Sequence, residues 1–326
     1  MVQAVGVRVP APQQIKIMGQ YIQKIFSGSS NRELTVKIAE QANLPVGDLV
    51  IERFSDGEMW VKYNENLRGN DIYIVQSTNA PGDNIIELTL LIDAAKRASA
   101  EKINVVIPYF GYSRQDRKDE PRVPISAKVM MDILTQAGAD RIITMDLHST
   151  QIQGFASIPV DNLYASNIFV DYIRKLKLPN LIMASPDTGG TRRAASYAKA
   201  LNTGFVICYK QRAKPNVIEQ MELIGDVEGK DVVLVDDIID TAGTITKAAD
   251  LIISRGASSV RAFCTHPIFS GNAYERLSKS KFDEIIVTDT VPLKQDLDKI
   301  KVLTTADLLA EVIHRVQNFE SISSLF

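Results

Sequence analysis

Residues Val232–Thr244 read VVLVDDIIDTAGT, and this run sets the expected architecture. Four apolar residues predict a buried strand, and Asp236 and Asp237 follow where that strand should leave its sheet. The segment Asp240-Thr241-Ala242-Gly243-Thr244 then turns into a helix. A small-residue loop at a helix N-terminus points several backbone N–H groups at one place, and the helix dipole favours an anion there. The run therefore predicts a strand, loop and helix that bind a phosphate group.

Side chains of the same run suit a phosphorylated sugar. Thr241 and Thr244 supply hydroxyl donors, and Gly243 permits close approach of the backbone. Carboxylates accept hydrogen bonds from diols, so Asp236 and Asp237 suit the 2′ and 3′ hydroxyls of a ribose. The structural alternative treats these polar residues as helix caps and solvated loop side chains. Two adjacent carboxylates directly after a buried strand favour the binding site.

Short β-branched runs alternate with helical patterns along most of the chain. The predicted strands are Ile72–Val75, Ile103–Ile107, Ile142–Met145, Leu181–Ala184, Phe205–Cys208, Val232–Val235, Val260–Cys264 and Glu284–Val287. The predicted helices are Asn84–Ser99, Ile125–Ala137, Thr191–Leu201 and Thr244–Ser254. This alternation favours an α/β fold with mainly parallel sheets, in which ligands bind at the carboxyl ends of the strands.

Two parts of the chain share one pattern, which we interpret as a duplication. Ile72–Phe110 and Val232–Phe269 each run from a strand through a polar loop and a helix to a second strand. The polar loops differ, because Gln76-Ser77 stands in the first copy where Asp236-Asp237 stands in the second. The predicted division is a flexible extension at residues 1–13, a first domain at 14–163 and a second at 164–326.

Composition excludes several classes of protein. Lys and Arg number 37 against 39 Asp and Glu, so the chain lacks the basic excess of a protein that coats nucleic acid. No apolar run approaches the roughly 18 residues of a membrane span. The two cysteines, Cys208 and Cys264, are too few for a disulfide framework and indicate a cytoplasmic protein. Neither a G-x-x-x-x-G-K-[ST] loop nor a G-x-G-x-x-G fingerprint is present.

Four further segments are rich in polar groups. They are Phe54–Glu58, Arg114–Lys118, Asp146–His148 and Ser185–Gly190. Taken singly, each has a structural explanation as a turn, a solvated charge run or a capping site. Three of the four follow predicted strands, where an α/β sheet builds its site.

With these segments the chain closely resembles the ribose-phosphate diphosphokinases, also called phosphoribosyl pyrophosphate synthetases. The resemblance runs from about Ile25 to Phe326 and is carried by FSGSSN, FSDGE, GYSRQDRK, DLHSTQIQGF, SPDTGG, KQRAKPN and VVLVDDIIDTAGT. It implies two phosphoribosyltransferase-like domains. It also implies transfer of the β,γ-diphosphoryl group of ATP to O1 of ribose 5-phosphate, which gives AMP and phosphoribosyl diphosphate for nucleotide biosynthesis.

The resemblance also implies an ATP site. Its residues would be Phe54, Asp56, Gly57, Glu58, Arg114 and Gln115. The aromatic ring of Phe54 would stack on adenine, and the carboxylates of Asp56 and Glu58 would accept from its exocyclic amine. Similar enzymes build this pocket between subunits, which implies a homo-oligomer, either a homohexamer or an assembly built from dimers.

The remaining implied roles concern metal, sugar and catalysis. Magnesium is the implied cofactor, with His148 and Asp187 as an associated pair and Asp146 and Asp161 as further ligands. Since Mg²⁺ prefers oxygen, part of the role of His148 would run through phosphate or water. The implied ribose 5-phosphate residues are Arg212, Asp236, Asp237, Asp240, Thr241, Ala242, Gly243 and Thr244. Lys210 and Arg212 would neutralise charge on the transferring diphosphate as catalytic residues.

The chain departs from its relatives at two informative places. Ser157 stands where many relatives carry an acidic residue, and Asn66 stands where phosphate-activated relatives carry a serine. Inorganic phosphate as an activator therefore rests on the ending Ser321–Phe326, which resembles that class. Two other functions stay open, a non-catalytic regulatory subunit and a phosphoribosyltransferase that joins the activated sugar to a base. Lys210 and the complete sugar loop argue against the first, and the FSDGE and RQDRK segments against the second.

Overall fold

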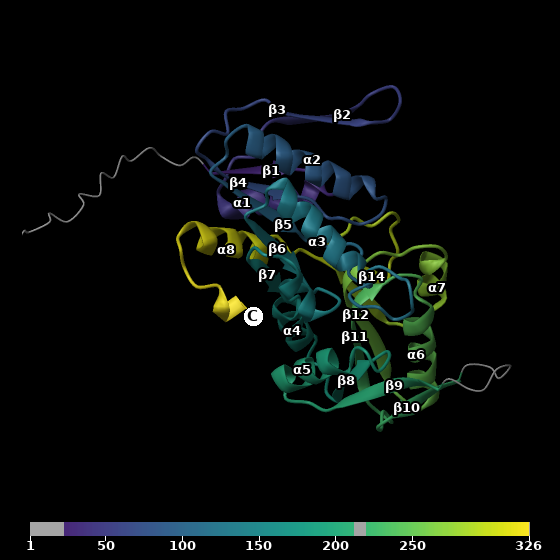
Figure 1. The fold of residues 1–326 in the computed structure, drawn as a ribbon. Coiled ribbons are helices and arrows are strands. Elements are labelled where there is room, and N and C mark those ends of the chain that lie inside the picture. The colour runs from purple at the N-terminus through teal and green to yellow at the C-terminus, as the bar shows by residue number, and fades with distance from the viewer. Residues whose placement is uncertain (1–22, 212–219, 326) are drawn as a thin grey trace, which may run out of the picture.

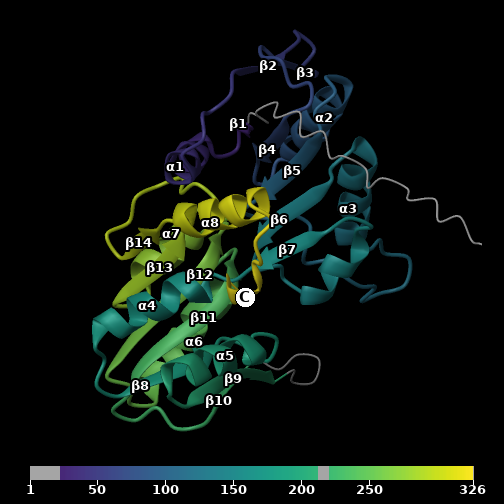
Figure 2. The same cartoon turned by 90° about the vertical axis from the view of Figure 1, so that its left-hand side faces the viewer.

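The computed structural model describes residues 23–211 and 220–325 and has two main sheets with helices on their faces (Figures 1 and 2). The first sheet is entirely parallel, in the order β1-β4-β5-β6-β7. The second has the order β10-β9-β8-β11-β12-β13-β14 and is parallel except where β10 pairs with β9. The α/β architecture predicted from the sequence is thus confirmed, and the proposed extension at residues 1–13 lies outside the described residues.

The strands and helices have the following bounds. The first sheet contains β1 (Lys24–Ser27), β4 (Asp71–Val75), β5 (Lys102–Ile107), β6 (Arg141–Met145) and β7 (Val160–Leu163). The second contains β8 (Leu181–Ser185), β9 (Phe205–Gln211), β10 (Gln220–Ile224), β11 (Asp231–Ile239), β12 (Ser259–Pro267), β13 (Glu284–Thr288) and β14 (Ile300–Leu303). The helices are α1 (Arg32–Ala42), α2 (Asp83–Arg97), α3 (Ser126–Ala137), α4 (Ser166–Leu176), α5 (Thr191–Leu201), α6 (Gly243–Ser254), α7 (Ala273–Lys279) and α8 (Ala306–Gln317).

The two sheets repeat one topology. Strands β1, β4, β5, β6 and β7 lie side by side in the first sheet, and β8, β11, β12, β13 and β14 lie side by side in the second. Each copy also has a hairpin in the same place along the chain. In the first copy β2 (Leu49–Arg53) and β3 (Met59–Tyr63) form a separate two-stranded sheet, whereas β9 and β10 extend the second sheet because β9 pairs with β8. The duplication therefore includes more of the chain than the two stretches with a shared sequence pattern.

A shared apolar core joins the two copies. One buried cluster contains Ile38 of α1 and Ile143 of β6 together with Phe263 of β12 and Ile313 of α8. Helix α8 packs against α1 and so joins the end of the chain to its first helix (Figure 2). Fully burying side chains of this size is worth ~1.5–3 kcal/mol each. The predicted boundary at residues 163–164 falls between β7 and α4, yet the packing across it is continuous.

Polar contacts hold the junction close to the strand ends. The Thr265 hydroxyl donates to Asp146 Oδ2 at 2.5 Å, and His266 Nε2 lies 3.1 Å from the Met145 carbonyl oxygen. Ser77 donates to the Thr290 carbonyl oxygen at 2.6 Å. These contacts tie the ends of β4 and β6 in the first copy to the second copy. Among the described helices, none is both long enough and apolar enough to cross a bilayer.

Candidate active site at the strand ends of the second sheet

Strand β11 is longer than its sequence pattern predicts. The expected strand ended at Val235, but β11 continues to Ile239, so Asp236 and Asp237 lie within it and the prediction that they follow the strand is wrong. The pairing explains the difference, because β11 stays bonded to β12 as far as Ile239, whereas its register with β8 stops at Leu234. Both aspartates therefore lie past the last β8 partner, at the edge where parallel sheets bind ligands.

Asp237 is the buried centre of the site. Its side chain is 6 % exposed, Arg193 Nη1 donates to Oδ1 at 3.0 Å, and His148 Nδ1 lies 2.7 Å from Oδ2. Burial alone would raise the pKa of this carboxyl, but the hydrogen bond with His148 and the charge of Arg193 lower it overall. The same hydrogen bond raises the pKa of His148. Asp237 is thus held as a carboxylate between two partners.

Asp236 has a different environment. It accepts the Asp237 backbone N–H at 2.9 Å through Oδ1, and Arg193 Nη1 lies 3.5 Å from that same oxygen. Burial and the neighbouring charge of Asp237 raise the pKa of Asp236 well above its usual range. The pKa values of the two adjacent carboxyl groups are therefore shifted in opposite directions. Arg193 is the cation next to both.

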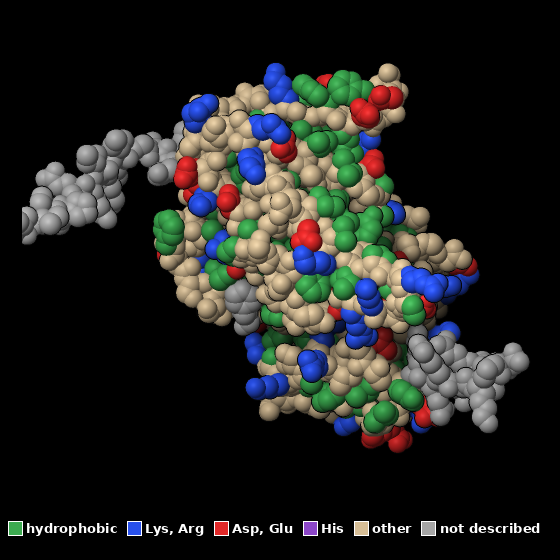
Figure 3. All heavy atoms as spheres, in the orientation of Figure 1, with side chains coloured by type: hydrophobic (Ala, Val, Ile, Leu, Met, Phe, Trp, Pro, Cys, Tyr) green, Lys and Arg blue, Asp and Glu red, His purple; other side chains and the backbone are tan. Residues whose placement is uncertain are grey.

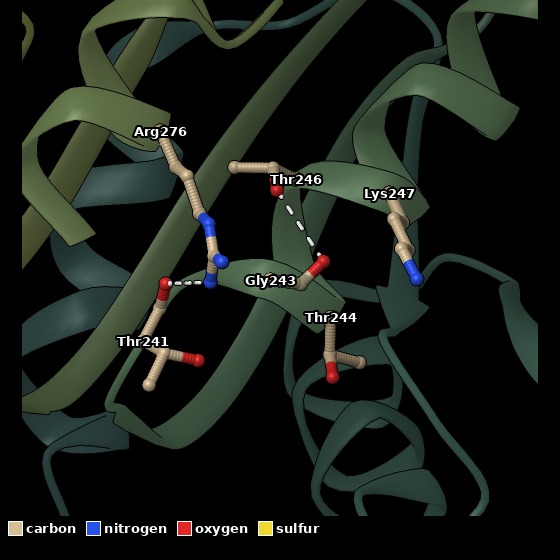
Figure 4. A pocket seen from close by; sticks show the side chains of 6 residues that line it. All are labelled: Thr241, Gly243, Thr244, Thr246, Lys247 and Arg276. Carbon is tan, nitrogen blue, oxygen red and sulfur yellow. Dashed lines mark hydrogen bonds between the residues drawn. The ribbon is translucent and has the colours of Figure 1, made fainter. Parts of the chain in front are cut away.

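Helix α6 starts at the predicted sugar loop. Ala242 precedes it with φ 60°, a left-handed conformation that costs strain in a residue with a side chain and recurs at functional sites. A cavity of about 390 Å³ opens beside this helix end, and its lining residues are Thr241, Gly243, Thr244, Thr246, Lys247 and Arg276 (Figure 4). Three of the predicted sugar residues line this cavity, as a phosphate site at a helix N-terminus requires.

The sequence analysis did not identify three cationic side chains of this region. Arg276 on α7 donates through Nη1 to the Thr241 carbonyl oxygen at 2.9 Å, and Lys247 projects from the first turns of α6 (Figure 4). Arg193 stands on the first turn of α5. Lys247 could have been found from its spacing, because it follows Thr244 by one helical turn. Arg193 and Arg276 carry no motif, since only the fold brings their helices to β11.

Asp240 connects the sugar loop to two other segments. Arg114 Nη1 donates to its Oδ2 at 2.6 Å, and the Ser270 hydroxyl donates to its Oδ1. Burial tends to raise the pKa of Asp240, but these two contacts lower it overall. Arg114, which the family resemblance assigns to ATP, therefore lies against the sugar loop. Gln115 beside it accepts from the Ser126 hydroxyl at the start of α3.

The lowered pKa of Asp240 predicts how the protein responds to acid. A carboxyl with a lowered folded-state pKa contributes stability above its unfolded pKa of about 4 and loses it as the pH falls through the folded value. The Asp240→Asn variant should therefore melt at a lower temperature than the unaltered protein at pH 7. That difference should shrink below about pH 4. Thermal unfolding of both proteins at pH 7, 5 and 3 checks this, and a constant difference down to pH 3 would contradict it.

The other predicted ATP residues lie on the β2–β3 hairpin. Phe54 is 56 % exposed, the Asp56 side chain accepts the Glu58 backbone N–H at 3.0 Å, and Gly57 turns the chain with φ 96°. Figure 3 shows exposed hydrophobic side chains on this hairpin. Both ribbon views place it at one end of the molecule, away from α6 (Figures 1 and 2). A single chain therefore does not bring the hairpin together with Arg114 and the sugar loop.

The four predicted metal residues do not form one cluster. Asp161 pairs with Arg141, near the amino ends of β6 and β7, so it lies at the opposite edge of its sheet. Asp146 is 6 % exposed and its Oδ2 accepts from Thr265. Asp187 accepts the Gly190 backbone N–H through Oδ1 at 3.1 Å. Across residues 23–211 and 220–325, no three His, Cys, Asp or Glu side chains are grouped to hold a metal ion.

The two predicted catalytic cations are described unequally. Lys210 lies in β9, where its Cα is opposite that of Met221 in β10. Arg212 lies outside the described residues. The register places Lys210 one residue before the end of β9.

Two family models match the chain, and between them they cover most of it. Residues 23–138 match the N-terminal domain of ribose phosphate pyrophosphokinase. Residues 206–326 match the phosphoribosyl synthetase-associated domain. The second match includes α6 and α7, whose residues line the cavity, and the strand β11 before them.

Similar proteins agree with the family models. A ribose-phosphate pyrophosphokinase of Wolinella succinogenes is 56% identical over 304 residues, which are 93% of this chain and 98% of the relative. A protein of the same name from Porphyromonas gingivalis is 54% identical, with 93% of this chain and 97% of the relative covered. The crystal structure of phosphoribosylpyrophosphate synthetase from Mycobacterium smegmatis matches with a TM-score of 0.86 at 36% identity, and the match covers 91% of this chain and 99% of that one.

Proposed function

The chain belongs to the ribose-phosphate pyrophosphokinase family, and from this membership we propose how its residues divide the work of the reaction. The enzyme transfers the β,γ-diphosphoryl group of ATP to O1 of ribose 5-phosphate. A bond forms between O1 and the β-phosphorus, and the bond from that phosphorus to the α-phosphate oxygen breaks. The products are AMP and 5-phospho-α-D-ribose 1-diphosphate.

One observation carries the proposed sugar site. The residues that line the cavity at the start of α6 follow Asp236, Asp237 and Asp240 closely in the sequence. We assign the 5-phosphate to the backbone N–H groups and hydroxyls of the helix start, together with Lys247 and Arg276. The sugar diol then faces the β11 carboxylates, which accept hydrogen bonds from hydroxyls. In this arrangement O1 of the sugar faces the carboxyl ends of the neighbouring strands, which is where we place the entry of ATP.

The ATP site in this proposal needs a second copy of the chain. Phe54 stands exposed on a hairpin tip that its own chain does not place beside Arg114. An exposed aromatic beside two carboxylates is suited to stack on adenine and accept from its amino group. We therefore assign Phe54, Asp56, Gly57 and Glu58 of one copy, with Arg114 and Gln115 of another, to ATP. A dimer-built assembly such as a homohexamer satisfies this requirement.

Magnesium fits the donor set that the chain offers. Mg²⁺ is commonly held by one or two carboxylates together with substrate phosphates and water, so a site with few protein ligands is enough for it. Asp187 uses only Oδ1 for its contact with Gly190 and could hold the ion, with His148 acting nearby. When bound, the ion would neutralise charge on the diphosphate. Asp146 and Asp161 are engaged with Thr265 and Arg141 and have no part in this proposal.

Two cations of the chain are assigned to catalysis. Lys210 and Arg212 neutralise charge on the transferring group, which phosphoryl-type transfer requires more than any covalent step. Two buried free thiols, Cys208 and Cys264, suit a reducing cytoplasm. Inorganic phosphate is proposed as an activator. Enzyme activity measured with and without phosphate and ADP tests this.

One assay separates this proposal from its alternatives. The purified protein is incubated with ATP, Mg²⁺ and ribose 5-phosphate, and AMP is measured. AMP that depends on the sugar supports the diphosphotransferase. A folded sample that forms no AMP favours a regulatory subunit. Consumption of a base together with phosphoribosyl diphosphate, in the absence of ATP, favours a phosphoribosyltransferase.

The Phe54→Ala variant tests the ATP assignment. Stacking of one base on an aromatic ring contributes about 1–3 kcal/mol, so the KM for ATP should rise by about tenfold or more. The KM for ribose 5-phosphate should change little, because Phe54 is assigned to the adenine ring and not to the pentose. Trp60→Ala is the matched control, since Trp60 is also exposed on the hairpin but lies in β3, outside the turn that carries Phe54. Equal ATP KM values in Phe54→Ala and the unaltered enzyme would remove Phe54 from the site.

A further inference from the structure

Arg193 has no role in the sequence motifs, yet it occupies the centre of the site. It stands on the first turn of α5, directly after the loop that carries Asp187. Its Nη1 lies 3.0 Å from Asp237 Oδ1 and 3.5 Å from Asp236 Oδ1, and its side chain is only 21 % exposed. A guanidinium this well buried between two carboxylates is an expensive arrangement unless all three groups are paired.

Asp236 and Asp237 differ in how many of their carboxylate oxygens are bound within the protein. Both oxygens of Asp237 are committed, Oδ1 to Arg193 and Oδ2 to His148. Asp236 uses Oδ1 for the Asp237 backbone N–H and for its ion pair with Arg193, and neither contact involves its Oδ2. Asp236 therefore has an acceptor to offer a substrate hydroxyl, whereas Asp237 is engaged within the protein.

We infer that Arg193 is a positioning residue, which holds Asp237 in place to orient His148 and sets Asp236 to receive the hydroxyls of the pentose. The inference rests on the proposed function, because it concerns the sugar side of that site. Arg193 acts through Asp237 and makes no direct contact with substrate phosphates in this account. Without the guanidinium, two adjacent carboxylates repel each other, and the Asp236 acceptor moves from its place.

The first test compares Arg193→Met with Lys199→Met. Lys199 is an exposed cation six positions along the same helix, so its variant removes one positive charge without touching the carboxylates. Arg193→Met should raise the KM for ribose 5-phosphate by about tenfold or more, because a charged contact to a buried acceptor is lost. The KM for ATP should stay within about twofold in both variants, and Arg193→Lys should recover part of the sugar affinity. A sugar KM in Arg193→Met equal to that of Lys199→Met overturns the inference.

A double variant distinguishes positioning from direct contact and guards against a folding defect. Arg193→Met/Asp237→Asn has no unpaired carboxylate at Asp237, so it should fold even if Arg193→Met alone does not. If Arg193 acts through Asp237, the sugar KM of the double variant should match that of Asp237→Asn alone. If the two effects multiply, Arg193 contacts the ligand itself and the inference is wrong. Sugar-dependent AMP formation by the unaltered enzyme in the same series shows separately whether the proposed function stands.

Discussion

Replacing Lys210 by alanine is expected to lower kcat by about a hundredfold to a thousandfold, the size of effect seen when one donor to a developing charge is removed. The residue stands one residue before the end of β9, and the charge that develops on the diphosphate belongs to the transition state more than to bound ATP. The KM for ATP should therefore stay within about threefold of its unaltered value. Steady-state rates of AMP formation at saturating ribose 5-phosphate measure both quantities.

A matched variant checks that this loss is local. Lys281→Ala removes an exposed lysine from the segment between α7 and β13 and should leave kcat unchanged. A Lys210→Ala enzyme with near-normal turnover would remove this residue from the mechanism. A large rise in the KM for ATP with an unchanged kcat would instead assign Lys210 to ground-state binding.

Replacing Asp240 by alanine should weaken binding of ribose 5-phosphate by about tenfold or more. The carboxylate fixes the loop before α6 through Arg114 and Ser270, and both donors lose their acceptor in the variant. The backbone N–H groups that follow would then no longer converge on one phosphate position. Calorimetric titration with ribose 5-phosphate measures the affinity directly.

The control for this variant lies on the same helix. Asp250→Ala removes an exposed carboxylate from α6 without touching the loop and should bind the sugar normally. Unchanged sugar affinity in Asp240→Ala would contradict the assignment of the loop.

Much of the fold could be predicted because its signals are local. The run Val232–Val235 and the small residues before α6 identify a strand and a helix start, and the structure places both there. The end of β11 could not be predicted, because aspartate is depleted in strands and two adjacent aspartates normally indicate that a strand has ended. Asp236 and Asp237 stay in the strand because β12 continues beside them and two partners from elsewhere, Arg193 and His148, compensate their charge.

The candidate site was only partly predictable for the same reason. Thr241 and Gly243 belong to a motif, so the sequence predicts them as phosphate ligands, and both residues line the cavity. Arg193 and Arg276 come from helices that only tertiary packing brings to β11, and a lone arginine on a helix has no spacing to recognise. Asp161 was predicted as a further metal ligand, and its ion pair with Arg141 becomes evident only when β6 and β7 pair.

A crystal structure with ribose 5-phosphate tests the central claim most directly. The account predicts the 5-phosphate in the cavity at the start of α6, against Thr241 and Gly243, with the sugar diol facing Asp236. A pentose bound elsewhere, with that cavity empty, would contradict it.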